Sequence, residues 1–203
     1  MKRHLTILIT LLAAFTTSHV TAQTPQSVLD KCLSTFGSGA YSATYSISGA
    51  QGNSSGTILL SGKKFRVISP ELKCWYDGST MWSWTKATGE VNITTPTAAD
   101  LAMTNPYAIA QNYKQAFTVN KGTSAGGAYT VKLTPKKKSN IKEVLLTVNT
   151  KTYYITKVQF VQKNNSKTTI TVSGYKSGLK TDGSTFKFQK NQVPKGTPTV
   201  DLR

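Results

Sequence analysis

Histidine and acidic residues are scarce in this chain of 203 residues. Both histidines, His4 and His19, lie near the N-terminus, and only 8 residues are Asp or Glu. Without histidine elsewhere, the usual serine and cysteine catalytic arrangements and most zinc sites are excluded. The carboxylates and glycines form no paired-acid motif and no phosphate-binding loop, so the sequence predicts no enzyme, no cofactor and no metal site. Two carboxylates brought together in space, as in a hydrolase, are the alternative that the sequence leaves open.

Long apolar runs are also missing, apart from one short run near the N-terminus. Lys2 and Arg3 precede a mostly apolar stretch over residues 5–15, and small residues lead up to Ala22. This run is shorter than the roughly 20 residues that a membrane-spanning helix needs, and the pattern is typical of a secretory signal. We therefore predict a signal peptide over 1–22, cleaved near Ala22, and one domain over 23–203. A membrane anchor is the alternative.

Acidic residues are outnumbered throughout the predicted mature chain. Removing Lys2 and Arg3 leaves 23 basic residues against 8 acidic ones. Such an excess would suggest nucleic acid for a cytosolic protein, but export argues against that partner. Anionic lipid headgroups, acidic proteins or a solvated surface remain. The run of lysines over 136–138 lies between Pro135 and Ser139, which is typical of a hairpin turn.

Cysteine occurs only twice, as Cys32 and Cys74. Because paired thiols persist as disulfides outside the cytosol, we predict a bridge between them. It would close a loop of about 40 residues and stabilise the fold by roughly 3–4 kcal/mol in the chain-entropy model. Two buried free thiols are the alternative.

The spacing of apolar residues predicts one helix followed by many short strands. Thr24 and Pro25 begin a helical pattern that Gly37 ends. Short β-branched and aromatic runs, divided by turn residues, then predict a long antiparallel meander. Its strands are expected over residues 40–49, 56–61, 64–69, 72–76, 79–85, 90–94, 115–120, 128–134, 142–149, 153–161, 167–174 and 184–188.

The segment 96–114 interrupts the strand pattern. Asn105 and Pro106 fit the N-cap and first position of a helix, so we predict two short helices here. They could form a lid over one face of the sheet or only seal an ordinary core. Alternation along the strands places apolar side chains on one face. Such a sheet must curl around its own side chains or enclose a cavity.

Four motifs, in order along the chain, resemble those of the periplasmic outer-membrane lipoprotein carrier (LolA-like) family. Residues 76–84 resemble the "DGKTLWxY" hairpin of that family, and residues 105–109 its proline-containing helical step. Residues 133–144 are similar to its "LTPK…LKxF" hairpin, and residues 186–203 to its "FxF…PxGxxVxD" tail. The resemblance implies a mainly β fold: a strongly curved, unclosed antiparallel half-barrel with an N-terminal helix and short lid helices.

The resemblance also implies a function. Family members shield the acyl chains of lipoproteins in a hydrophobic cavity during transfer from the inner to the outer membrane. The partners expected for a monomeric periplasmic carrier are acylated lipoproteins, an inner-membrane lipoprotein-releasing ABC transporter and an outer-membrane acceptor. A periplasmic binding or sensor protein for another hydrophobic ligand is the alternative. The residues expected to line the cavity and lid are Phe65, Val67, Trp82, Trp84, Met103, Tyr107 and Ile109, with Met81 replacing the tryptophans if these face outward.

One departure from the family concerns the lid. Members carry Lys-Arg-Pro before the strand that contains Phe65, and the arginine helps to hold the lid. This chain has Ser61-Gly62-Lys63-Lys64 at that place. The family's lid contact is therefore left open in this chain, with Lys63 or Lys64 as the candidate substitute.

Overall fold

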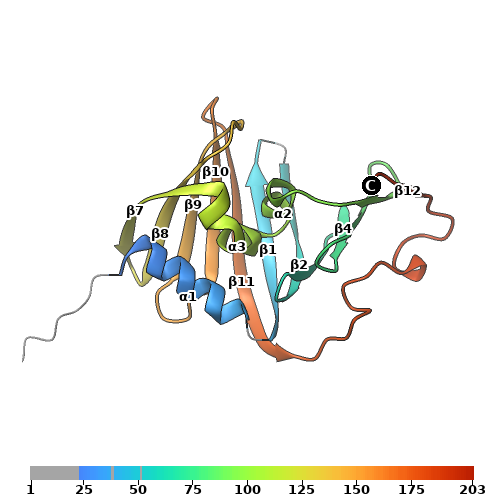
Figure 1. Cartoon of the computed structure of the whole chain (residues 1–203). Coiled ribbons are helices and arrows are strands. Elements are labelled where there is room, and N and C mark those ends of the chain that lie inside the picture. Colours follow the sequence, from blue (N-terminus) through green and yellow to red (C-terminus); the bar gives the residue numbers. More distant parts are fainter. Residues whose placement is uncertain (1–22, 38, 51) are drawn as a thin grey trace, which may run out of the picture.

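The computed structural model describes residues 23–37, 39–50 and 52–203, so the predicted signal peptide over 1–22 lies outside it. The described chain forms one sheet of twelve strands in the order β12-β6-β5-β4-β3-β2-β1-β11-β10-β9-β8-β7. Figure 1 shows this sheet curving around one side, with helices across its concave face. The predicted mainly β, unclosed half-barrel is confirmed. Within the described ranges, no helix has the length and apolar character needed to cross a membrane.

Two antiparallel meanders make up most of the sheet, and they join where β1 pairs with β11. The first contains β1 (Ala40–Gly49), β2 (Gly52–Ser61), β3 (Lys64–Ile68), β4 (Leu72–Tyr76), β5 (Met81–Thr85) and β6 (Val91–Thr94). The second contains β7 (Phe117–Ala125), β8 (Ala128–Pro135), β9 (Ile141–Asn149), β10 (Ile155–Gln162) and β11 (Lys167–Leu179). The pairing of β1 with β11 joins the two meanders into one sheet, so both meanders contribute strands to its concave face.

Irregular pairing bends the sheet at β11 and at β7. The register between β1 and β11 shifts near Ser42 and Thr44, and Gly174 and Gly178 on β11 adopt φ values of 62° and 71°, which favour glycine. On β7 the register shifts between Val119 and Gly122. Bulges of this kind increase the local twist of a sheet. The added twist allows this wide sheet to curve around a core without closing into a barrel.

Three α-helices contribute to the concave side: α1 (Pro25–Gly37), α2 (Ala98–Thr104) and α3 (Pro106–Ala116). The predicted start of α1 is supported by a hydrogen bond from the Ser27 amide to Thr24 Oγ1 at 3.1 Å. Asn105 ends α2 and caps α3, accepting a hydrogen bond from the Tyr107 amide at 2.9 Å. The two short helices predicted between residues 96 and 114 are therefore confirmed.

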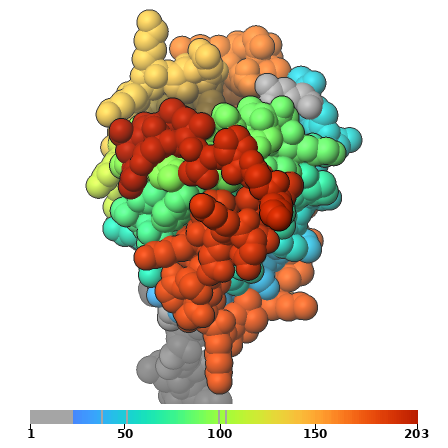
Figure 2. Space-filling model, turned by 90° about the vertical axis from the view of Figure 1, so that its right-hand side faces the viewer, coloured from blue at the N-terminus to red at the C-terminus, as the bar shows by residue number. Residues whose placement is uncertain are grey.

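The C-terminal region differs from the prediction. Residues 184–188 form turns and no strand, and they are followed by the 3-10 helix η1 (Lys190–Gln192). A twelfth strand, β12 (Thr199–Asp201), pairs in parallel with β6, so the sheet is not wholly antiparallel. Figure 2 shows the C-terminal segment, coloured orange-red to red, lying across the green strands of the first meander. This segment therefore covers the outer face of the sheet.

The predicted Cys32–Cys74 disulfide is absent, since both cysteines are free thiols. Both side chains are buried in the main apolar core, Cys32 on α1 and Cys74 on β4. Burial raises the pKa of each thiol to about 12. The alternative of two buried free thiols is the arrangement found.

Candidate functional site

The main apolar core, on the concave side of the sheet, contains a cavity of about 110 Å³. Strands from both meanders and the junction of α2 with α3 form its walls. The lining residues are Tyr45, Ile47, Ile58, Leu60, Val67, Leu72, Thr104, Asn105, Pro106, Tyr107, Ile155, Ile170, Val172 and Tyr175. None of them is charged and most are apolar, so the cavity suits an uncharged, largely apolar ligand.

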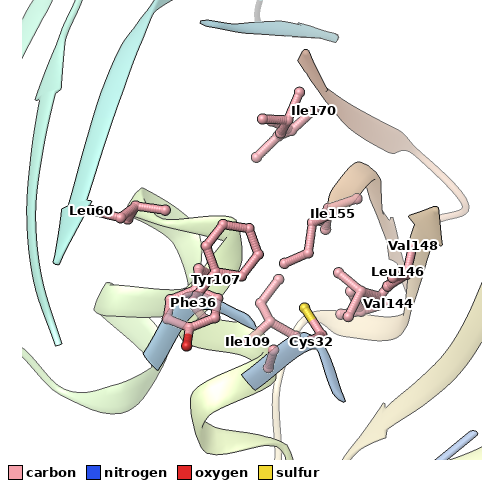
Figure 3. Close-up of a cluster of buried hydrophobic side chains, with 14 of the residues drawn as sticks. Cys32, Phe36, Leu60, Tyr107, Ile109, Val144, Leu146, Val148, Ile155 and Ile170 are labelled. Atoms are coloured by element: carbon pink, nitrogen blue, oxygen red, sulfur yellow. The ribbon is translucent and has the colours of Figure 1, made fainter. Parts of the chain in front are cut away.

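Among the described residues of the lid, Tyr107 is the one aromatic residue that lines this cavity. In Figure 3 Tyr107 and Phe36 lie next to each other, between Leu60 on one side and Ile155 on the other. The ring centroids of Tyr107 and Phe36 are 4.6 Å apart. The Tyr107 hydroxyl donates a hydrogen bond to the Leu33 carbonyl of α1 at 3.0 Å. Tyr107 therefore fills part of the concave side while its polar end is satisfied by α1.

Aromatic residues also form the part of the cavity wall next to α1. Tyr175 of β11 stacks against Tyr154 with ring centroids 4.4 Å apart, and its hydroxyl donates to the Ile155 carbonyl at 2.8 Å. Burial raises the pKa values of Tyr107 and Tyr175 above that of an exposed tyrosine. Both rings therefore remain neutral at physiological pH, and the wall stays apolar.

Polar contacts hold α3 to the rest of the molecule. Gln111 Nε2 donates to the Gly62 carbonyl in the β2–β3 turn at 3.0 Å. Tyr113 donates its hydroxyl to Asp30 of α1 at 2.8 Å, and Lys114 forms an ion pair with the same carboxylate at 3.2 Å. The helix α3 is thus tied to both α1 and the sheet.

The expected lid contact from Lys63 or Lys64 is not found within the described residues, where neither side chain forms a hydrogen bond or ion pair. The contact between the β2–β3 turn and the lid comes from Gln111 instead. A lysine in the turn would have donated a hydrogen bond to the lid. Here the side chain of Gln111 on the helix donates and the backbone carbonyl of Gly62 in the turn accepts.

No polar tether of this kind joins α2 to the sheet within the described residues. Its hydrogen bonds are internal, including the capping box between Thr97 and Asp100. Ala102 is buried and Leu101 packs against the main core. The helix α2 is therefore held by apolar contacts alone.

Four of the predicted cavity residues lie in the main core. Val67 and Tyr107 line the cavity. Phe65 and Ile109 are buried beside it, with 1% and 0% of their surfaces exposed, and do not line it. The prediction for Met103 concerns a side chain outside the described part of the chain, although its backbone belongs to α2.

Trp82 and Trp84 do not join this group. Both belong to a second apolar cluster on the outer face of the sheet, which we call the outer tryptophan cluster: Trp75, Trp84, Val91 and Val193, with Ile68, Trp82 and Phe188 packed against it. The C-terminal segment covers it, and Lys73 Nζ donates to the Gln192 carbonyl at 2.7 Å. The tryptophans face outward because this segment buries their side of β5. Met81, the stated substitute, packs against the main core.

Several cavity residues were not predicted as part of the site. Ile47, Ile170 and Val172 follow the alternation that places apolar side chains on one face of a strand, and this pattern gives no reason to single them out. Tyr175 has the opposite parity to Val172, and it reaches the inner side because the bulge at Gly174 shifts the alternation. No sequence signal other than Gly174 itself indicates that shift.

Nothing in the described residues gathers the side chains that metal binding requires. No three of their His, Cys, Asp and Glu side chains are grouped closely enough to hold a metal ion. The buried thiols have raised pKa values, and nucleophilic cysteines need the opposite shift. The arrangement therefore supports ligand binding in the cavity and offers no activated nucleophile there.

Comparisons with solved structures find the same architecture elsewhere. An uncharacterised conserved protein from Thermus thermophilus superposes with a TM-score of 0.60 at 12% identity, covering 87% of this chain and 98% of the other. A LolA superfamily protein from Nitrosomonas europaea superposes with a TM-score of 0.46 at 14% identity, covering 82% and 99%. A putative outer membrane lipoprotein-sorting protein domain from Vibrio parahaemolyticus gives 0.47 at 13% identity, covering 82% and 97%.

A comparison with curated proteins found no significant match. A family profile described as outer membrane lipoprotein carrier protein LolA matches residues 14–165, which is more than half of the chain. The chain therefore belongs to the LolA family of outer membrane lipoprotein carrier proteins.

Proposed function

We propose that this protein is a periplasmic carrier that shields the acyl chains of lipoproteins during their transfer from the inner to the outer membrane. The observation that carries the proposal is the uncharged cavity between the concave sheet and the α2–α3 lid. Proteins of this family are periplasmic carriers and binding proteins and not enzymes. A carrier role fits an apolar site without charged or activated groups.

The energetics of acyl chains explain why a carrier needs such a site. Each buried methylene gains about 0.8 kcal/mol, so a sixteen-carbon chain gains on the order of 12 kcal/mol when it leaves water. Unassisted diffusion of such a chain between membranes is negligible. A hydrophobic cavity removes most of this penalty.

The cavity is too small to hold a long acyl chain. At about 110 Å³ it is smaller than the engineered cavities of about 150 Å³ that hold benzene. A long acyl chain therefore requires Tyr107 and the lid to move outward. Because α3 is tied to α1 and to the β2–β3 turn while α2 has only apolar contacts, α2 is the helix that we expect to move first.

Loading and release are proposed to depend on partners. The described chain offers a cavity and no nucleotide-binding loop, so the energy for extraction would come from an inner-membrane lipoprotein-releasing ABC transporter. An outer-membrane acceptor would then receive the lipoprotein from the monomeric carrier.

The test is the binding of a fluorescent acyl-chain probe to the protein and two variants. Ile170→Phe fills the cavity from β11, whereas Thr171→Phe adds the same ring to the exposed side of the same strand. We expect Ile170→Phe to weaken probe binding by about tenfold or more and Thr171→Phe to leave it unchanged. Equal binding by all three proteins would contradict the proposal.

Competition separates the carrier from a sensor of another ligand. A triacylated lipopeptide should displace the probe at least as well as a free fatty acid if lipoproteins are the cargo. Displacement by the fatty acid alone would favour the binding or sensor role.

A further inference from the structure

Two hairpin turns at one end of the half-barrel carry an unpaired group of lysines. The turns join β8 to β9 and β10 to β11, and they project side by side in Figures 1 and 2. A hydrogen bond from the Lys163 amide to the Asn140 carbonyl, at 2.9 Å, links them. We call their exposed lysines the lysine rim: Lys137, Lys138, Lys142, Lys163 and Lys167.

The lysine rim has no compensating carboxylate among the described ion pairs. Glu143, the only acidic residue between Pro135 and Thr168, is paired with Lys132. Lys142 Nζ is 3.4 Å from the side-chain oxygen of Asn165, which is neutral. The positive field of the rim is therefore directed at solvent.

This charge is unevenly distributed in the second meander. At its opposite end, the β7–β8 turn has no charged residue and the β9–β10 turn has only Lys151. In the other meander, two carboxylates lie at the same end of the molecule as the rim but on turns other than those that carry the rim. Glu71 lies between β3 and β4, and Glu90 lies between β5 and β6. The turns of the second meander thus carry most of their lysines at one end, while Lys176 and Lys180 are exposed at the other end of β11.

The cavity lining runs along the strands, from Leu60 and Tyr175 at the opposite end toward the end that carries the lysine rim. Ile170 lines the cavity and comes three residues after Lys167, which is about 10 Å along an extended strand. Its cross-strand partner Ile47 also lines the cavity, two residues before the end of β1. A surface that contacted the rim would therefore face one end of the cavity lining.

We propose that the lysine rim is a docking surface for a bilayer that contains anionic phospholipid, and that it presents the cavity to the membrane. This rests partly on the proposed function, which gives the membrane as the source of the acyl chains. Lysine favours this partner over an acidic protein, because its ammonium is a hydrated point charge, whereas arginine suits paired contacts with carboxylates. Only Arg66 and Arg203 occur among the 23 basic residues after Ala22.

The contact should be electrostatic and reversible. Among the described residues, Leu202 is the only large apolar side chain that is exposed, so the rim has nothing to insert into the hydrocarbon. Raising the ionic strength from about 0.1 M to about 1 M shortens the Debye length from about 10 Å to about 3 Å. Binding should then disappear, which would let a carrier leave the membrane again.

The experiment is vesicle co-sedimentation of protein purified from the exported fraction. One set of vesicles is phosphatidylcholine, and the other also contains phosphatidylglycerol. The test variant changes Lys137, Lys138 and Lys163 to Gln. The control changes Lys151, Lys180 and Lys195 to Gln, which are also exposed and remove the same charge elsewhere.

We expect binding only to the anionic vesicles, with a partition coefficient that falls by roughly 10- to 100-fold in the rim variant and by less than about fivefold in the control. If the partition coefficient fell equally in both variants, binding would depend only on net charge, and the proposal would be overturned. Binding to polyglutamate without binding to anionic vesicles would overturn it in favour of an acidic protein partner.

Acyl-probe binding by the same variants separates this inference from the proposed function. The rim variant should bind the probe in solution as the unmodified protein does, because its lysines do not line the cavity. Normal vesicle docking without any probe binding would contradict the carrier function and leave the docking surface intact. Normal probe binding without vesicle docking would contradict the docking surface and leave the carrier function intact.

Discussion

Gln111 on α3 donates its side-chain amide to the backbone carbonyl of Gly62, 3.0 Å away in the β2–β3 turn. This bond joins the lid to the first meander, whereas Tyr107 and Tyr113 join it to α1. The lid is therefore joined to the sheet at the β2–β3 turn and to α1 through two tyrosines. Because Gly62 accepts through its backbone carbonyl, mutation can remove this hydrogen bond only at the Gln111 side chain.

Gln111→Ala should loosen the lid. The loss of one partly buried hydrogen bond should lower the free energy of unfolding by about 0.5–1.5 kcal/mol and speed the entry of an acyl probe. Gln115→Ala is the matched control, since Gln115 lies on the same helix and is exposed without a side-chain hydrogen bond in the described structure. Stopped-flow probe binding and urea unfolding measure the two effects. Identical entry rates in both variants would show that this bond does not hold the lid.

The two thiols should be free and protected in the folded protein. Their pKa values of about 12 leave almost no thiolate at neutral pH, and both side chains are buried. Alkylation followed by intact-mass measurement should label neither cysteine in the native protein and both in denaturant. A denatured protein that resists labelling until it is reduced would restore the predicted bridge.

Stability should fall at alkaline pH. Burial raises the pKa of Cys32 and Cys74 from 9.0 to about 12, so their protonated forms favour the folded state. This contribution is complete below pH 9 and is lost as the pH rises toward 12, by about 1–2 kcal/mol per thiol at pH 10. Tyr107 and Tyr175 act in the same direction above pH 10.

Urea unfolding at several pH values measures this loss. The double variant Cys32→Ala, Cys74→Ala should lose less stability between pH 8 and pH 10 than the unmodified protein. An equal loss in both would show that the thiols do not couple folding to pH.

Tryptophan emission should not report on the cavity. Trp75 and Trp84 are buried in the outer tryptophan cluster, on the face of the sheet opposite the cavity. An acyl probe should therefore leave the emission maximum unchanged, whereas Phe188→Ala should shift it to longer wavelength by opening the cluster to water. The ring centroids of Phe188 and Trp75 are 5.4 Å apart. A shift on probe binding would place a tryptophan near the cavity after all.

Local signals in the sequence were enough to predict most of the secondary structure. Asn105 and Pro106 predicted the break between α2 and α3 because a cap and a fixed φ act within one turn of chain. The strands of the second meander followed their alternation, with Val144, Leu146 and Val148 all fully buried. These features depend on interactions between residues that are close together in the chain, so they can be predicted from the local sequence.

Features that depend on distant segments were not predictable in the same way. The inward face of β5 was misassigned because Phe188 and Val193, more than a hundred residues away, bury the side that carries Trp82 and Trp84. Tyr175 was missed because a bulge reverses the parity of β11. The pairing of Cys32 with Cys74 was inferred from compartment chemistry, which gives no information on whether two buried sulfur atoms come within bonding range.

The two outer strands of the sheet, β12 and β7, affect how copies of the protein behave at high concentration. An exposed edge offers unpaired amides and carbonyls to strands of other molecules, which leads to fibres and precipitates. Here β12 has only three residues, and it is followed by Arg203, which binds Asp201 at 2.6 Å. The β7 edge is interrupted by the bulge between Val119 and Gly122, where Lys121 is exposed. Neither edge is a long, flat template, so an open sheet of twelve strands should resist edge-to-edge aggregation.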